Sequence, residues 1–311
     1  MCNKGLRMKI AFTFPLLFTP PIASAGYIDY ELLDRGTTQV RGSLVSLAGE
    51  GTLETTIGNT AYSADVDLEQ RSFALDAIFA PVDEANLAIR VGAAETSSLK
   101  YSYSVNELTV TEEREGAGDL DAELRFKLGS GQSYPVVAIG ATVPAGNDDE
   151  PQPEVKTASG VQQQGETGGR SRGTTDYSLG AGYFTASEAV KAFVGASYSV
   201  RGENEGTDYG DEVALLGQAS VSVSESIGIV GTALYETTDN TDHNAGHNEF
   251  EPGVGLSVGG IFSISPKSEL IAEVVLLDGP SISYYDETGY HYATLEMGRT
   301  AGFALTYQAR F

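Results

Sequence analysis

Apolar and polar side chains alternate in segments of about ten residues that recur from about Asp67 to the end of the chain. The clearest segment is DLDAELRFKL, in which Leu120 and Leu124 share one face while Asp121 and Glu123 share the other. Period-two alternation is typical of a β-strand with one apolar face. About ten residues is also the length that a tilted strand needs to cross a bilayer. This pattern leaves two fold classes, a soluble β-protein and a membrane-spanning β-barrel.

The connections between these segments distinguish the two classes. Short connections at 81–86, 129–132, 186–188, 224–226 and 265–268 alternate with long polar ones at 103–118, 144–173, 201–211, 237–249 and 278–291. A soluble sandwich has no reason to place every long loop at one end. The sequence therefore predicts an all-β, transmembrane antiparallel up-and-down β-barrel of about twelve strands, with ten to fourteen possible. Short turns would be periplasmic and long loops extracellular.

Two regions are harder to place within that barrel. Eleven strands can be counted back from the C-terminus to about residue 67, so the twelfth is expected within Val40 to Ala64. The apolar parity changes there, between Val66 and Phe73. The composition of 144–173 is typical of a mobile polar segment, and we expect a disordered extracellular loop.

The two ends of the chain indicate its destination. A basic start, the apolar stretch IAFTFPLLF and small residues before Gly26 predict a signal peptide at 1–25, cleaved after Ala25. Residues 26–39 would be a periplasmic lead-in and 40–311 the barrel. The last strand ends on a bare aromatic, and Tyr307 with Phe311 resembles the signal read by the barrel assembly machinery of Gram-negative bacteria. The expected location is the outer membrane, in contact with its lipid and lipopolysaccharide.

Composition excludes several functions. The only cysteine, Cys2, lies in the predicted signal peptide, so the mature chain would have no disulfide and no thiolate site. The net charge is −24, and it becomes −27 when the three cations of residues 1–25 are removed. A chain this acidic is not expected to bind nucleic acid. No cofactor is expected.

A family resemblance comes from GAGDLDAELRFKL and YPVVAIGATVPAGND. Gly118-Asp119-Leu120 opens a strand, and the next strand ends in Pro144-Ala145-Gly146-Asn147, where the family commonly has Thr in place of Ala145. These features resemble the outer-membrane transporters of the MetA-pathway of phenol degradation family, relatives of the fatty-acid and toluene uptake barrels. The resemblance runs from about 116 to 200. It implies passage of small, often aromatic or apolar solutes.

Charged side chains on the polar faces are the main candidate site, because they would point into the lumen if the apolar faces meet lipid. Ten of the fifteen are acidic, so an open lumen would favour cations or neutral solutes. Alternatively, acids and bases pair across the lumen and fill it. The candidates are Asp76, Arg90, Asp119, Asp121, Glu123, Arg125, Lys127, Asp176, Lys191, Glu212, Glu236, Glu251, Glu269, Glu273 and Arg310.

The predicted loops contain all three histidines, at 243, 247 and 291. They could serve an outer-membrane hydrolase, the weakest of three functional hypotheses, although no catalytic residues can be assigned and a non-enzyme is expected. Asp239, Asp242 and Glu249 offer oxygen ligands of the kind that Ca²⁺ prefers, without EF-hand spacing. The leading hypothesis is a porin-like passive channel for small, possibly aromatic or hydrophobic solutes. A structural or surface-interaction barrel with a charge-plugged lumen and acidic loops is the alternative.

Overall fold

The computed structural model describes residues 30–57, 60–104, 107–171, 173–204, 206–243, 245–279 and 281–311. The predicted signal peptide and its cleavage site lie outside the described residues, as do the first four residues of the predicted lead-in. Within the described ranges no helix is long and apolar enough to cross a membrane.

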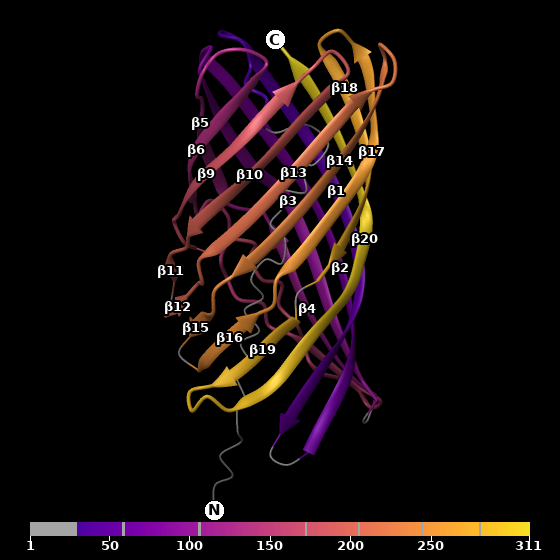
Figure 1. The fold of residues 1–311 in the computed structure, drawn as a ribbon. Helices are drawn as coiled ribbons and strands as arrows, with labels where there is room; N and C mark the ends of the chain where they lie inside the picture. Colours follow the sequence, from indigo (N-terminus) through magenta and orange to yellow (C-terminus); the bar gives the residue numbers. More distant parts are fainter. Residues whose placement is uncertain are drawn as a thin grey trace, which may run out of the picture.

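The described chain forms one antiparallel sheet that closes on itself (Figure 1). Twelve strands make the wall of the barrel, which confirms the predicted fold class. They are β1 (Thr38–Ile57), β2 (Thr60–Val82), β3 (Ala85–Tyr103), β5 (Leu120–Lys127), β6 (Ser133–Val143), β9 (Asp176–Ala186), β10 (Val190–Val200), β13 (Glu212–Ser222), β14 (Ile227–Thr238), β17 (Gly253–Ser265), β18 (Ser268–Asp278) and β20 (His291–Arg310).

The first and last strands close the barrel. β1 pairs with β20 from Gln39 opposite Arg310 to Thr55 opposite Ala293. At the rim, the amide of Phe311 donates to the carbonyl of Thr38 at 2.8 Å, and the amide of Thr38 donates back at 3.2 Å. Phe311 lies at the end of the barrel that carries the short turns (Figure 1). This pairing removes the exposed sheet edge, as expected for a membrane barrel.

The outer surface around the short-turn end is apolar. Leu75 is 44 % exposed, Val194 64 % and Val258 60 %, and similar residues point outward on the other wall strands. A soluble protein rarely exposes so continuous an apolar surface. In a closed barrel, whose backbone groups pair internally, such a belt is what lipid requires. Fold and surface together define an outer-membrane-type β-barrel.

Strand β2 explains the change of parity seen in the sequence. Its pairing with β1 runs without a register shift, so it is one continuous strand of 23 residues. Phe73 and Leu75 are exposed on the apolar belt, whereas Ala64 and Val66 are buried inside the barrel. The apolar face changes sides because β2 leaves the belt. The expected strand boundary near residue 67 is therefore wrong, and the first two wall strands are β1 and β2.

The long connections are largely strands rather than irregular loops. They contain short strands that extend the sheet at the end opposite Phe311 (Figure 1). The expected disorder of 144–173 is wrong for its described residues, which include two of these strands. The extension strands are β4 (Leu108–Gly116), β7 (Glu154–Thr157), β8 (Gly160–Gln163), β11 (Glu203–Asn204), β12 (Thr207–Asp208), β15 (Thr241–His243), β16 (Gly246–Phe250) and β19 (Ser281–Asp286).

An apolar cluster fills the inside of this extension. Leu53, Tyr101, Ile282 and Leu295 are each at most 1 % exposed and come from β1, β3, β19 and β20. Outward positions at the same level are charged, as in Asp67. A protein domain surrounded by water has apolar side chains inside and charged side chains outside. The extension therefore lies beyond the apolar belt.

Candidate functional site: the lumen

Two adjacent cavities lie inside the belt region of the barrel. The larger has a volume of about 290 Å³ and is called the polar cavity here because it is lined by many charged and hydroxyl side chains. The smaller, of about 60 Å³, is mainly apolar. Tyr30, Ser197 and Leu216 line both. The combined space reaches the lower end of the size range of small-molecule pockets in proteins.

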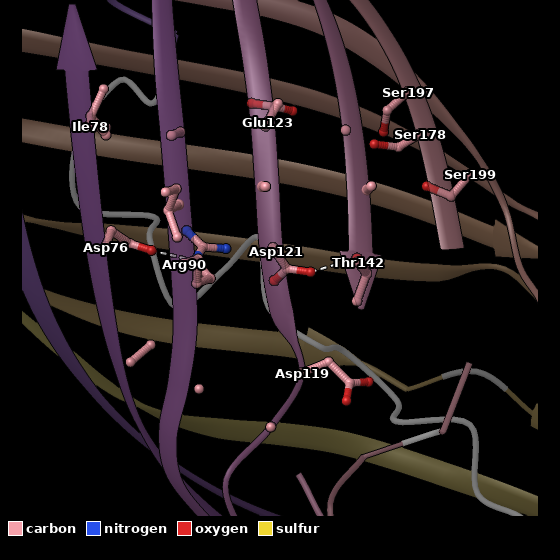
Figure 2. A pocket seen from close by; sticks show the side chains of 18 of the residues that line it. Asp76, Ile78, Arg90, Asp119, Asp121, Glu123, Thr142, Ser178, Ser197 and Ser199 are labelled. Carbon is pink, nitrogen blue, oxygen red and sulfur yellow. Dashed lines mark hydrogen bonds and ion pairs between the residues drawn. The ribbon is translucent and has the colours of Figure 1, made fainter. Parts of the chain in front are cut away.

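Carboxylates on β5 form one wall of the polar cavity. Asp119 precedes the strand, and Asp121 and Glu123 follow on the same face because side chains alternate along a strand (Figure 2). The hydroxyl of Thr142 on β6 donates to Asp121 at 2.5 Å. Glu123 forms an ion pair with Arg125 two residues further along β5.

The neighbouring strands β3 and β2 continue this wall and carry a compensated pair. The guanidinium of Arg90 on β3 lies 2.6 Å from the carboxylate of Asp76 on β2, and the two residues are register partners (Figure 2). Ser178 and Ser199 from β9 and β10 add hydroxyl groups to the lining. The polar cavity therefore offers hydrogen-bonding groups whose charges are largely balanced by neighbours.

The end of the polar cavity nearer the extension is closed by a buried ion pair. Arg170, from the long connection between β6 and β9, is 4 % exposed and donates two hydrogen bonds to one oxygen of Glu95, at 2.7 and 3.0 Å. Arg170 donates a third hydrogen bond to the hydroxyl oxygen of Ser97, at 3.0 Å. Glu95 lies where β3 leaves β5 and begins to pair with β4. The connection is thereby anchored in the mouth of the cavity.

The residues of the family resemblance build the base of that connection. A Cβ on Gly146 would lie 2.0 Å from the carbonyl oxygen of Ala117, so only glycine allows this approach. The carbonyl of Asn147 accepts from the amide of Ser171 at 2.9 Å, beside Arg170. The Pro-X-Gly-Asn segment thus packs against the strand opening at Gly118 and supports the arginine that enters the lumen.

The smaller cavity is apolar because several strands carry apolar residues on their inner faces. Phe193, Val136 and Leu234 are each at most 5 % exposed and line it. These inward residues were not predicted. The only signal was that SYPVVAIGATV is apolar on both faces, which is expected of a strand between lipid and an apolar lumen.

The residues before β1 enter the lumen from the short-turn end. The Tyr30 ring stacks on Phe193, with ring centroids 4.3 Å apart, and the Arg125 guanidinium lies 4.6 Å from the Tyr30 centroid. Glu31 accepts from Lys191 at 2.8 Å and lies 3.4 Å from Arg310. Residues 30–37 of the predicted lead-in thus contact the barrel from inside, and its last two residues, 38 and 39, already belong to β1.

The structure gathers some predicted lumen charges and separates others. Asp76, Arg90, Asp119, Asp121, Glu123 and Arg125 line the polar cavity. Lys191 and Arg310 contact Glu31 instead. The remaining seven are placed as follows: Lys127 donates to the carbonyl of Gly131, Asp176 accepts from Thr174, Glu212 pairs with Arg201, Glu236 is half-buried, Glu251 is exposed, Glu269 accepts from Gln308, and Glu273 accepts from Ser257.

Sequence reasoning also missed Tyr30, Glu31, Glu95 and Arg170. Tyr30 and Glu31 precede any strand, and Glu95 and Arg170 belong to a strand bulge region and a polar connection. No periodicity marks any of them. Tyr307 and Phe311, the predicted assembly signal, are 48 % and 71 % exposed on the belt side.

The histidines lie in the extension, away from both cavities. The ring of His247 stacks on Tyr285 with centroids 4.6 Å apart, and His291 lies 2.8 Å from the hydroxyl of Thr294. His243 accepts from the amide of Ala245. Among the described residues, no group of three or more His, Cys, Asp or Glu side chains could hold a metal ion. The acids Asp239, Asp242 and Glu249 are therefore not gathered into a site.

The comparisons with known proteins agree with the fold. No protein-family model matches the sequence, and no curated protein matches it at a significant level. Among solved structures, the chain is similar to an outer membrane channel from Pseudomonas putida F1, with a TM-score of 0.56 and 13 % identity over 92 % of this chain and 99 % of that one.

Two further structures are more distant. They are the CymD monoaromatic hydrocarbon channel, with a TM-score of 0.47 and 10 % identity over 90 % of this chain and 89 % of that one, and the toluene transporter TbuX of Ralstonia pickettii. For TbuX the TM-score is 0.47 and the identity 10 %, over 93 % of this chain and 92 % of the other. At these identities the likeness concerns the fold.

Proposed function

We propose that this protein is a passive outer-membrane channel for small solutes that combine an apolar or aromatic body with a polar group. The observation that carries the proposal is the pair of adjacent cavities, one polar and one apolar, inside a closed barrel. Small-molecule sites typically combine apolar walls with a few polar groups that orient the ligand. The resemblance to the MetA-pathway of phenol degradation family supports the same solute class.

The predicted lumen charges have a defined part in this proposal. Asp121, Glu123 and the Asp76–Arg90 pair offer hydrogen bonds to a passing polar group. The apolar wall around Phe193 and Val136 accepts the body of the solute. Passage would need no energy source, because the solute moves down its own gradient.

Solute entry into proteoliposomes tests the proposal. Phenyl glucoside should enter faster than glucose, because its phenyl ring can pack against the apolar side chains of the smaller cavity. Ser197→Trp should slow entry at least about tenfold, since Ser197 lines both cavities, whereas Val194→Trp on the lipid-facing side of the same strand should not. Equal entry rates for both variants would refute a path through these cavities.

A second candidate is a structural barrel whose lumen is plugged. The buried Glu95–Arg170 pair and the contacts of Glu31 favour it, because paired charges can fill a narrow barrel. In that case neither phenyl glucoside nor glucose would enter liposomes at any rate above protein-free vesicles.

The cellular setting is part of the proposal. The signal peptide is removed after Ala25, the assembly machinery reads Tyr307 and Phe311, and the extension faces the lipopolysaccharide. Fractionation should recover the protein in outer membranes, and amino-terminal sequencing should begin at Gly26. Recovery in the periplasm would contradict the proposal.

A further inference from the structure

The ring of Tyr30 occupies a site made by the barrel itself. Phe193 on β10 stacks on the ring at a centroid distance of 4.3 Å, with the two planes only 15° apart. The guanidinium of Arg125 on β5 lies over the same ring, 4.6 Å from its centroid. Stacking and a cation over a ring face both favour a planar aromatic group. The wall side chains would offer the same contacts to an aromatic ring from another molecule.

The carboxylate of Glu31 occupies a second part of the same site. Lys191, two residues from Phe193 on β10, donates to both oxygens of Glu31, at 2.8 and 2.9 Å. Arg310 on the closing strand lies 3.4 Å from one of them. Two cations from separate strands thus hold one carboxylate beside one aromatic ring. Charge-assisted contacts of this kind are the strong ones in protein recognition.

We propose that this is a binding site for an aromatic carboxylate, which Tyr30 and Glu31 occupy as an internal ligand. The proposal rests on the proposed channel function and names the solute class of its short-turn end. Four side chains carry the recognition: Phe193 and Arg125 take the ring, and Lys191 and Arg310 take the carboxylate. The chain as a whole is acidic, but the three charged side chains of this site are cations, so they can bind a carboxylate.

Displacement of Tyr30 would also change the path. Tyr30 lines both cavities, so its side chain lies between the polar space of about 290 Å³ and the apolar space of about 60 Å³. An aromatic carboxylate that displaces it would lie at the junction of the two. The apparent affinity of such a solute equals its intrinsic affinity multiplied by the fraction of time for which the internal ligand has left the site.

Titration calorimetry on the full folded chain in detergent tests the site, with benzoate as the probe. Tyr30→Ala/Glu31→Gln should bind benzoate at least about tenfold more tightly than the unsubstituted protein, because the competitor is gone. Glu31→Gln alone should give part of that gain. Asp34→Asn is the matched control, since Asp34 is an exposed carboxylate of the same segment, and should leave the affinity unchanged.

Two further probes separate the parts of the site. Benzyl alcohol lacks the carboxylate and cyclohexanecarboxylate lacks the aromatic ring, so each should bind the double variant at least about tenfold more weakly than benzoate. Lys191→Gln added to the double variant should remove most of the benzoate affinity, and heat-modifiable migration on gels shows which variants are folded. If Lys191→Gln does not fold, Phe193→Leu is measured in its place, with the same loss expected.

Three results would overturn the inference: equal benzoate affinity with and without Tyr30 and Glu31, equal affinity for the three probes, or no binding to any folded variant. These outcomes are distinct from failure of the channel. Phenyl glucoside entry without benzoate binding would refute the site and leave the channel function standing. Benzoate binding without solute entry would support the site and refute the channel.

Discussion

The buried pair between Arg170 and Glu95 can be tested by removing each charge. Their closest atoms are 2.7 Å apart, and at an effective dielectric constant of about 20 this separation corresponds to an attraction of about 6 kcal/mol, part of which offsets the cost of desolvation. Because both side chains are nearly inaccessible to solvent, removing one leaves the other charge buried. We expect Arg170→Met and Glu95→Gln each to destabilise the anchored connection by about 3–5 kcal/mol.

Hydrogen exchange of the connection measures this effect locally. The amides of Gly168 and Ser171 donate to Glu113 and Asn147 in the closed form, so they exchange when the connection opens. Each single variant should speed their exchange by about 150- to 5,000-fold, and the double variant should cost about 3 kcal/mol less than the sum of the two. Additive effects would show that the pair does not anchor the connection.

The chain offers a matched control for this cycle. Lys156 and Glu154 form an ion pair in the same connection, with side chains 52 % and 33 % exposed. Exposed pairs contribute about 0–1 kcal/mol, so Lys156→Met with Glu154→Gln should show almost no coupling. A coupling as large as that of Arg170 and Glu95 would mean that burial is not the reason.

The remaining predictions concern the extension, the turn and the terminus. Burial raises the pKa of Glu112 to about 7. The contribution of this carboxyl group to the stability of the fold is therefore complete below about pH 4.5 and is lost as the pH rises through 7. This pH-dependent loss of stability amounts to about 3 kcal/mol and can be followed by hydrogen exchange of β3 and β4. Glu112→Gln should abolish the pH dependence, and a variant with the same pH profile as the unsubstituted protein would refute the assignment to Glu112. Gly146→Ala should destabilise the connection by about 1–3 kcal/mol in a hydrogen-exchange assay, because its Cβ would meet the carbonyl oxygen of Ala117. Gly217→Ala is the control, since its Cβ would have no atom within 4 Å, and equal effects of the two variants would contradict the contact with Ala117. Phe311→Asp should lower the yield of heat-modifiable barrel in membranes at least about tenfold and Phe311→Tyr should not; equal yields would exclude Phe311 as an assembly signal.

The barrel could be predicted from the sequence because its physics is local. Lipid outside and polar groups inside impose the alternation of Leu120 to Lys127, and tight turns at one end leave the long connections at the other. The same reasoning misplaced the start of β2, because it assumes one apolar face per strand. Val66 and Phe73 are apolar on opposite faces, since one lies in the extension and the other in the belt.

The lumen was harder to predict because its contacts are long-range. Arg170 meets Glu95 across 75 residues, and Lys191 meets Glu31 across 160. Period-two alternation says which side chains point inward, but not which of them meet. The apolar cavity was hidden for a related reason: on strands such as β6, the inner and outer faces are both apolar, so alternation is lost where the lumen is apolar.

Single-channel conductance in planar bilayers tests the central claim, that the lumen is a solute path narrowed at its short-turn end by Tyr30 and Glu31. The unsubstituted protein should show small, discrete conductance steps. Tyr30→Ala/Glu31→Gln should raise the conductance at least about twofold, whereas Asp34→Asn should leave it unchanged. Bilayers that contain the folded double variant but show no conductance would contradict the account and favour a plugged structural barrel.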